Sequence, residues 1–201
     1  TTIYNSLQLS VFSTTLSTFN LPSLTTVGSI AISGTQSALT TLNLSSITRV
    51  KNYNAVQESN TYIQTTALGT VSITNIGPTV VNLSRLNQVD HQITIGSSSF
   101  TGIYLNSLVS VGKYPSSQGS TTLATYTNFT LSSSSLLTTL NLSNLTTVYG
   151  GMSLAACNSL TGYNFPALTS IGSSLVAYPT LSTPFFPVGL TWTGGTSTTS
   201  L

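Results

Sequence analysis

The sequence predicts an all-β protein built as a parallel β-solenoid, a rod in which successive coils of the chain stack on one another. Three observations support this prediction. A phrase of about 12 residues recurs along the chain, and its apolar residues alternate with a period of two. Thr, Val and Tyr are abundant, and no segment keeps the 3.6-residue apolar period of a helix. Strands are therefore expected in every repeat.

The recurring phrase aligns without a gap in five places. It reads LSTFNLPSLTTV from Leu16, LTTLNLSSITRV from Leu39, FTGIYLNSLVSV from Phe100, LTTLNLSNLTTV from Leu137 and LTGYNFPALTSI from Leu160. We call its fifth residue the zero position, which falls at Asn20, Asn43, Tyr104, Asn141 and Asn164, with a sixth copy at Asn82 and weaker copies around Gln64 and Phe185. The spacing predicts about eight coils of about 22 residues, a length typical of solenoid repeats.

Each copy predicts two or more short strands separated by Gly- and Ser-rich corners. Apolar residues stand at positions −4, −1, +1, +4 and +7, as in Leu39, Leu42, Leu44, Ile47 and Val50. The −1/+1 pair predicts a strand with the zero position turned outward. A second alternation at about +10 to +13 predicts another strand, in Ile30 and Ile32, Ile93 and Ile95, Met152 and Leu154, and Leu175 and Ala177. Stacked strands would pair in parallel over one core. A β-sandwich is the alternative.

The repeat also suggests how the chain is organised. Residues 1–15 are expected to form an N-terminal strand or cap that could pair between subunits, residues 16–190 the solenoid, and residues 191–201 a flexible Ser/Thr/Gly tail. Residues 113–127 break the coil rhythm and are interpreted as an insertion, either a tolerated loop or a recognition loop using Tyr114 and Tyr126. The start at Thr1 without Met predicts a secreted chain whose signal peptide has been removed.

Charge is too scarce for several functions. Charged residues make up 3% of the chain, where ordinary domains have about 25%. The cations are Arg49, Lys51, Arg85 and Lys113, too few and too scattered to bind nucleic acid, and no apolar run approaches the roughly 20 residues of a transmembrane segment. In the repeat frame, Asp90 and Lys113 fall at one corner of adjacent coils and are expected to pair there.

The same scarcity argues against catalysis. Glu58 and Asp90 stand on different predicted coils, so they do not form the carboxylate pair of a glycosidase. Asp90 and His91 could belong to a Ser-His-Asp hydrolase triad, but the sequence contains no Gly-x-Ser-x-Gly nucleophile elbow. A single His and a single Cys, Cys157, do not provide a metal site. A non-enzymatic protein with no catalytic residues, cofactor or metal is therefore expected.

Candidate modification sites are more numerous. Five Asn-x-Ser/Thr sequons begin at Asn43, Asn82, Asn128, Asn141 and Asn144. Asn43, Asn82 and Asn141 are zero positions, which the strand alternation turns toward solvent, so N-glycosylation is expected there. The alternative is a stacked ladder in which Asn side-chain amides hydrogen-bond from coil to coil.

The wording of the repeat resembles a known family. The phrases LTTLNLSSITRV, FNLPSLTTVG and LNLSNLTTV, each followed by an apolar alternation, resemble receptor L-domain repeats, and most of all those of GPI-anchored fungal cell-wall glycoproteins. The resemblance covers roughly Leu16 to Leu190. It implies a right-handed, leucine-rich-repeat-like solenoid located outside the cell or at its surface.

These expectations converge on a structural role. A solenoid leaves a strand edge at each end, and edges invite association unless they are guarded. The assembly candidates are Leu7, Leu9, Val11, Phe185, Phe186 and Trp192. The predicted protein is an extracellular or cell-surface building block that carries covalent glycans and assembles head to tail into filaments or a lattice. The alternatives are an ice-binding solenoid, suggested by pairs such as Thr40-Thr41, and a carbohydrate- or protein-recognition ectodomain.

Overall fold

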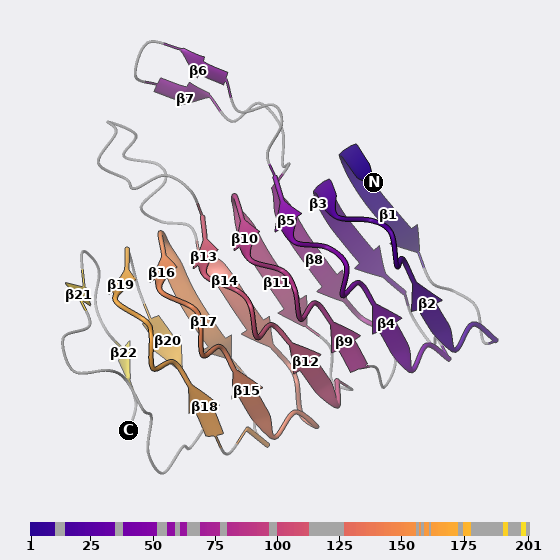
Figure 1. Ribbon diagram of the computed structural model, residues 1–201. Helices are drawn as coiled ribbons and strands as arrows, with labels where there is room; N and C mark the ends of the chain where they lie inside the picture. Colours follow the sequence, from indigo (N-terminus) through magenta and orange to yellow (C-terminus); the bar gives the residue numbers. More distant parts are fainter. Residues whose placement is uncertain are drawn as a thin grey trace.

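The computed structural model describes residues 1–10, 15–34, 38–51, 56–58, 61–63, 69–76, 80–96, 100–112, 127–155, 157, 159–160, 162–172, 175–177, 191–192 and 198–199. The regular elements of this part of the chain are all strands, as expected (Figure 1). Strands of three kinds recur in a fixed order, so that each coil repeats the course of the one before it.

The first kind of strand ends at the zero position. These strands are β2 (Thr18–Asn20), β4 (Thr41–Asn43), β9 (Val80–Asn82), β12 (Gly102–Tyr104), β15 (Thr139–Asn141) and β18 (Gly162–Asn164). Each of the corners that follow β4, β9, β12, β15 and β18 is closed by a backbone hydrogen bond from position +4 to position +1, such as Ile47 N–H to Leu44 O at 3.0 Å. This turn explains why +1 and +4 are both apolar, since both side chains enter the core.

The second and third kinds follow that corner. The second kind comprises β5 (Arg49–Val50), β10 (Gln88–Val89), β13 (Ser110–Val111), β16 (Thr147–Val148), β19 (Ser170–Ile171) and β21 (Thr191–Trp192). The third comprises β8 (Thr70–Thr74), β11 (Gln92–Gly96), β14 (Thr127–Ser132), β17 (Gly151–Ala155), β20 (Leu175–Ala177) and β22 (Thr198–Thr199). Two longer strands, β1 (Thr2–Ser10) and β3 (Thr26–Ser33), cover both positions.

Neighbouring coils pair in parallel, strand on equivalent strand. The large sheet has the order β21-β19-β16-β13-β10-β5-β3-β8-β11-β14-β17-β20-β22, with β1 on β3, and the first-kind strands form the sheets β12-β9-β4-β2 and β15-β18. Among the pairings described, the one antiparallel pair is the hairpin of β6 (Val56–Glu58) and β7 (Thr61–Ile63). The chain is therefore a parallel β-solenoid, and the sandwich alternative is wrong.

The core is a stack of ladders of equivalent residues. The apolar set Leu39, Leu42, Leu44, Ile47 and Val50 is fully buried, as its spacing predicts. Position +7 is β-branched in six copies, and its side chain has no solvent exposure at Val27, Val50, Val89, Val111, Val148 and Ile171. Burying one such side chain is worth about 1.5–3 kcal/mol, so the ladders stabilise the rod along its length.

One predicted coil does not exist. Strand β4 pairs directly with β9, with Asn43 opposite Asn82, so no coil lies between them, and the copy placed around Gln64 was wrong. Gln64 itself lies outside the described residues. The hairpin β6–β7 instead leaves the solenoid after β5 and stands away from the stacked strands (Figure 1). The 39 residues between Asn43 and Asn82 are close to two repeat lengths, so repeat counting alone predicts an additional coil there.

The two ends of the chain join the sheet. Strand β1, within the expected N-terminal strand, pairs with β3 from Thr2 to Ser10. Within residues 191–201, where a flexible tail was expected, β21 pairs with β19 and β22 with β20. Residues 113–126 of the expected insertion lie outside the described residues, and Thr127 begins β14.

Candidate functional site

The zero positions form one row on the surface of the rod. Asn20 stands opposite Asn43, Asn43 opposite Asn82, and Asn82 opposite Tyr104, on the neighbouring strands β2, β4, β9 and β12. Asn20 is exposed and Asn43 and Asn82 are half-buried, while their −1 neighbours are turned inward. The outward orientation predicted for this row is confirmed.

The three zero-position sequons share one local geometry. The backbone N–H two residues ahead donates to the Asn Oδ1, from Ser45 to Asn43 at 3.2 Å, from Ser84 to Asn82 at 3.1 Å and from Ser143 to Asn141 at 3.0 Å. These are Asx turns, which fix the side chain against its own corner. The Nδ2 atoms of these three residues make no hydrogen bond within the described part of the chain. The amide ladder between coils, the alternative for this row, is therefore not formed.

The remaining two sequons differ from these three. Asn144 is exposed, but its Nδ2 donates to the backbone oxygen of Asn106 in the preceding coil at 2.6 Å. This Nδ2 atom, to which a glycan would be attached, is thus engaged in a hydrogen bond between coils. Asn128 lies in β14, and its side chain is outside what the structure describes.

The end of the solenoid at β1 and β2 is apolar. The hydrophobic residues that pack against the core but stay partly exposed are Ile3, Leu7, Leu9, Leu16, Phe19 and Leu21. All six belong to the first coil, where the structure describes no further coil beyond them. Of the other assembly candidates, Val11, Phe185 and Phe186 lie outside the described residues, and Trp192 is described only as part of β21.

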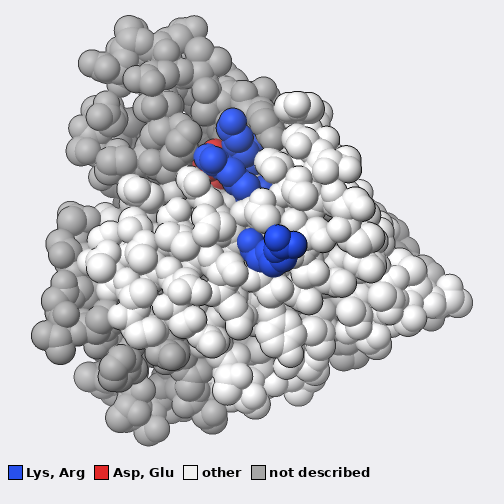
Figure 2. All heavy atoms as spheres, viewed as in Figure 1, with Lys and Arg blue, Asp and Glu red and all other residues white. Residues whose placement is uncertain are grey.

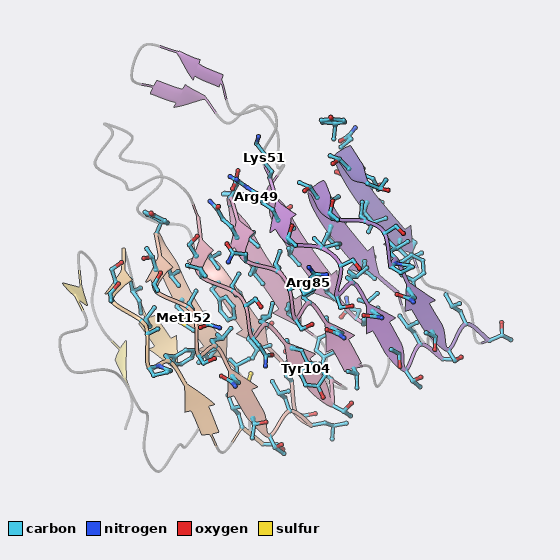
Figure 3. All side chains as sticks on the ribbon, in the orientation of Figure 1. Arg49, Lys51, Arg85, Tyr104 and Met152 are labelled. Atoms are coloured by element: carbon cyan, nitrogen blue, oxygen red, sulfur yellow. The ribbon has the colours of Figure 1, made fainter. Side chains whose placement is uncertain are left out.

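Charged side chains gather at one corner. Arg49 Nη2 lies 3.1 Å from Asp90 Oδ1, and the side chain of Asp90 is 1% exposed whereas that of Arg49 is 35% exposed. The expected partner of Asp90, Lys113, lies outside the described residues. Figures 2 and 3 show Arg49 and Lys51 together at β5, with Arg85 separated from them by uncharged surface. The described surface on this side is otherwise neutral.

Burial affects two titratable side chains, His91 and Cys157. Burial lowers the pKa of His91, and burial raises the pKa of the Cys157 thiol against a smaller opposing effect of hydrogen bonds with Ser134. Among the residues described, no three His, Cys, Asp or Glu side chains are grouped in a way that could hold a metal ion. The same residues include no helix long and apolar enough to cross a membrane.

Several threonine hydroxyls bond to the backbone of the preceding coil. The donors are the hydroxyls of Thr25, Thr40, Thr48, Thr146 and Thr169, and the acceptors are the carbonyl oxygens of Thr1, Ser17, Thr25, Val109 and Thr146, at 2.9–3.1 Å. The same residues also donate their backbone N–H groups to these oxygens. Each such threonine therefore ties two coils together twice.

The fold and this surface define the class of the chain: a parallel β-solenoid with neutral sides, one outward Asn row and one apolar end. Compared with known proteins, the chain matches no family model, and no curated protein and no solved structure matches it.

Proposed function

We propose that this chain is a non-enzymatic structural glycoprotein of the cell surface or extracellular wall, and that its copies associate end to end into filaments or a lattice. The observation that carries this proposal is the apolar end at β1 and β2. The six side chains named there are half-covered by their own coil and would be covered completely by one more coil.

A second copy supplies what such an end requires. Coils of this chain already fit one another, because inward residues of neighbouring coils are in register, as Leu7 is with Ile30 and Leu9 with Ile32. Strand β1 contains no charged residue and no Pro, the usual devices that stop strand edges from pairing. Heterologous contacts form rings where the rotation between copies closes and open filaments where it does not, and copies stacked end to end along the axis of a rod do not close.

The Asn row supports the glycoprotein part of the proposal. Asn43, Asn82 and Asn141 face outward with Nδ2 free of hydrogen bonds in the described part of the chain, which is the arrangement an N-linked sugar needs. A coat of hydroxyls, amides and sugars also stays hydrated with little dependence on salt, because there are few charges for salt to screen.

The threonine contacts favour this role over ice binding. An ice-binding face needs an array of hydroxyls directed at solvent, whereas the hydroxyls of Thr40, Thr146 and their equivalents donate to carbonyls of the preceding coil. The first threonine of the pairs Thr40-Thr41 and Thr146-Thr147 is thus explained by a bond that holds the coils together.

Sedimentation velocity over a range of concentrations, combined with negative-stain imaging, tests the assembly. The wild-type chain is expected to form rods longer than one molecule as concentration rises. Leu9→Lys places a charge at the apolar end and should abolish the longer species. Leu136→Lys is the matched control, because it makes the same change from Leu to Lys at a residue that is 51% exposed and lies between β14 and β15, away from the apolar end.

The two variants separate assembly from folding. Both should keep the β-sheet circular dichroism of the wild type, and Leu136→Lys should still assemble. A wild-type chain that stays monomeric at every concentration, or a Leu9→Lys variant that is folded and still forms rods, contradicts the proposal.

A further inference from the structure

Tyr104 is the exception in the Asn row. It occupies the zero position of β12, directly opposite Asn82 on β9, and it is 48% exposed. Paired strands are about 4.8 Å apart, so the two side chains leave the same face as immediate neighbours. On its other side Asn82 is opposite Asn43. Asn82 therefore stands between another sequon and an exposed aromatic ring.

The ring leans along the surface of the sheet. A Cβ added at Gly102, two residues earlier on β12, would lie 3.7 Å from the Tyr104 hydroxyl oxygen and 3.8 Å from its Cε2. The ring therefore bends back over Gly102, on the outward face. Figure 3 shows Tyr104 on β12, far from the charged corner of Arg49 and Lys51. Val80 Cγ1 would lie 3.7 Å from the same added Cβ, so the ring offers apolar surface on the outward face of β12, next to the strand that carries Asn82.

The side chain of Asn82 is already positioned for modification. The Ser84 N–H holds Oδ1 at 3.1 Å, which fixes the amide plane and leaves Nδ2 on the outward side. A substituent on Nδ2 would meet the Asn43 side chain on one side and the Tyr104 ring on the other. The side with the ring is the one that offers apolar contact.

We propose that Asn82 carries an N-linked glycan whose first sugar packs its C–H face against the ring of Tyr104. The inference rests on the proposed function, because it requires passage through a glycosylating secretory route. In the transfer step, Nδ2 forms a bond to C1 of the first sugar of a lipid-linked oligosaccharide diphosphate. The bond from C1 to the diphosphate oxygen breaks, the lipid diphosphate leaves, and one amide proton passes to the transferring enzyme and then to solvent.

This contact gives the glycan a structural role. An aromatic ring and the apolar face of a sugar both lose water-exposed surface when they stack, and the gain is available only when both partners are present. The sugar would thereby act as one more outward residue that links the coils of β9 and β12. The effect expected for a contact of this size is a change in melting temperature of about 2–4 °C in a domain of this length.

The test is a double-mutant cycle on protein secreted from a eukaryotic host, with glycopeptide mass spectrometry at every sequon. Tyr104→Asn restores the residue found at most other zero positions. Ser84→Ala destroys the sequon but keeps the Asn82 amide and its bond to the backbone of residue 84. Tyr104→Asn is expected to lower the melting temperature by about 2–4 °C in the glycosylated chain and to have no effect in the Ser84→Ala chain.

A second pair of variants serves as the control. Tyr104→Asn should behave in an Asn141→Gln background as it does in the wild type, because the proposed contact involves the Asn82 glycan alone. Equal effects of Tyr104→Asn with and without the Asn82 glycan, or an unmodified Asn82 beside occupied Asn43 or Asn141, overturn the inference and leave the proposed function standing. No glycan at any sequon overturns the glycoprotein assignment itself.

Discussion

Arg49 and Asp90 form an ion pair between neighbouring coils, with Nη2 and Oδ1 3.1 Å apart and the carboxylate almost completely buried. Arg49→Met removes the guanidinium that lies beside this buried carboxylate. We expect this variant to lose about 1–3 kcal/mol of unfolding free energy in denaturant titrations, since the exposure of Arg49 weakens the pair.

The matched variant for this pair is Arg49→Met combined with Asp90→Asn. It also removes the charge of the buried carboxylate and should recover part of the loss. If Arg49→Met alone has the same unfolding free energy as the wild type, the ion pair contributes nothing to folding.

Gly28 marks a close approach between β3 and the edge strand β1. A Cβ at this position would lie 2.7 Å from the backbone oxygens of both Tyr4 and Asn5. Gly28→Ala should therefore displace β1 and lower the unfolding free energy by about 1–3 kcal/mol. Gly102→Ala is the control, because its nearest neighbours would be 3.7 Å away, and its effect should stay within about 0.5 kcal/mol. Chemical denaturation measures the unfolding free energy of both variants. Equal values for Gly28→Ala and Gly102→Ala would contradict the close packing of β1 on β3 at Gly28.

The buried ladder at position +1 should tolerate truncation poorly. Leu142 has no exposed surface, and replacing it with Ala leaves a cavity between the coils of β12 and β18. The expected loss is about 2–5 kcal/mol. Leu136, which is 51% exposed, provides the comparison, and Leu136→Ala should change stability by less than about 0.5 kcal/mol. Thermal and denaturant unfolding measure both.

His91 should make stability depend on mild acid. Burial lowers its pKa in the folded chain below the ordinary 6.5, so the unfolded chain binds the proton first as the pH falls. The unfolding free energy should therefore be constant above about pH 7 and decrease from about pH 6.5 toward pH 5. His91→Gln should flatten the curve over this range. A wild-type profile already flat between pH 7.5 and pH 5 would contradict the assignment.

The strands were predictable because each one is short and its inward residues are spaced by two. Leu42 and Leu44 flank Asn43 in the chain, and burial of both flanks forces the middle residue outward, as observed. The copies at Asn20, Asn82 and Asn141 follow the same rule. The parallel pairing followed from the repetition itself, because identical coils present identical strands to one another.

The ion pair of Arg49 with Asp90 could not be predicted from the sequence, and the fold shows why. With an extra coil assumed around Gln64, Arg49 would lie two coils from Asp90, whereas the pairing of β5 with β10 makes their coils neighbours. The hairpin β6–β7 occupies a length that repeat counting cannot distinguish from a coil. The hydrogen bond from Asn144 to Asn106 joins residues that are 38 positions apart, on either side of the insertion at residues 113–127. The sequence alone therefore does not distinguish Asn144 from the other sequons.

The detour through β6 and β7 has a consequence for chain entropy. From Asn20 to Asn43 one coil takes 23 residues, and from Asn43 to Asn82 it takes 39, yet the same register is kept. The entropy of closing a loop grows only with the logarithm of its length, so the additional chain costs about 0.5 kcal/mol. Surface segments at a corner of this rod can therefore be replaced, lengthened or removed with little change in the unfolding free energy, while the stacked coils keep the same register.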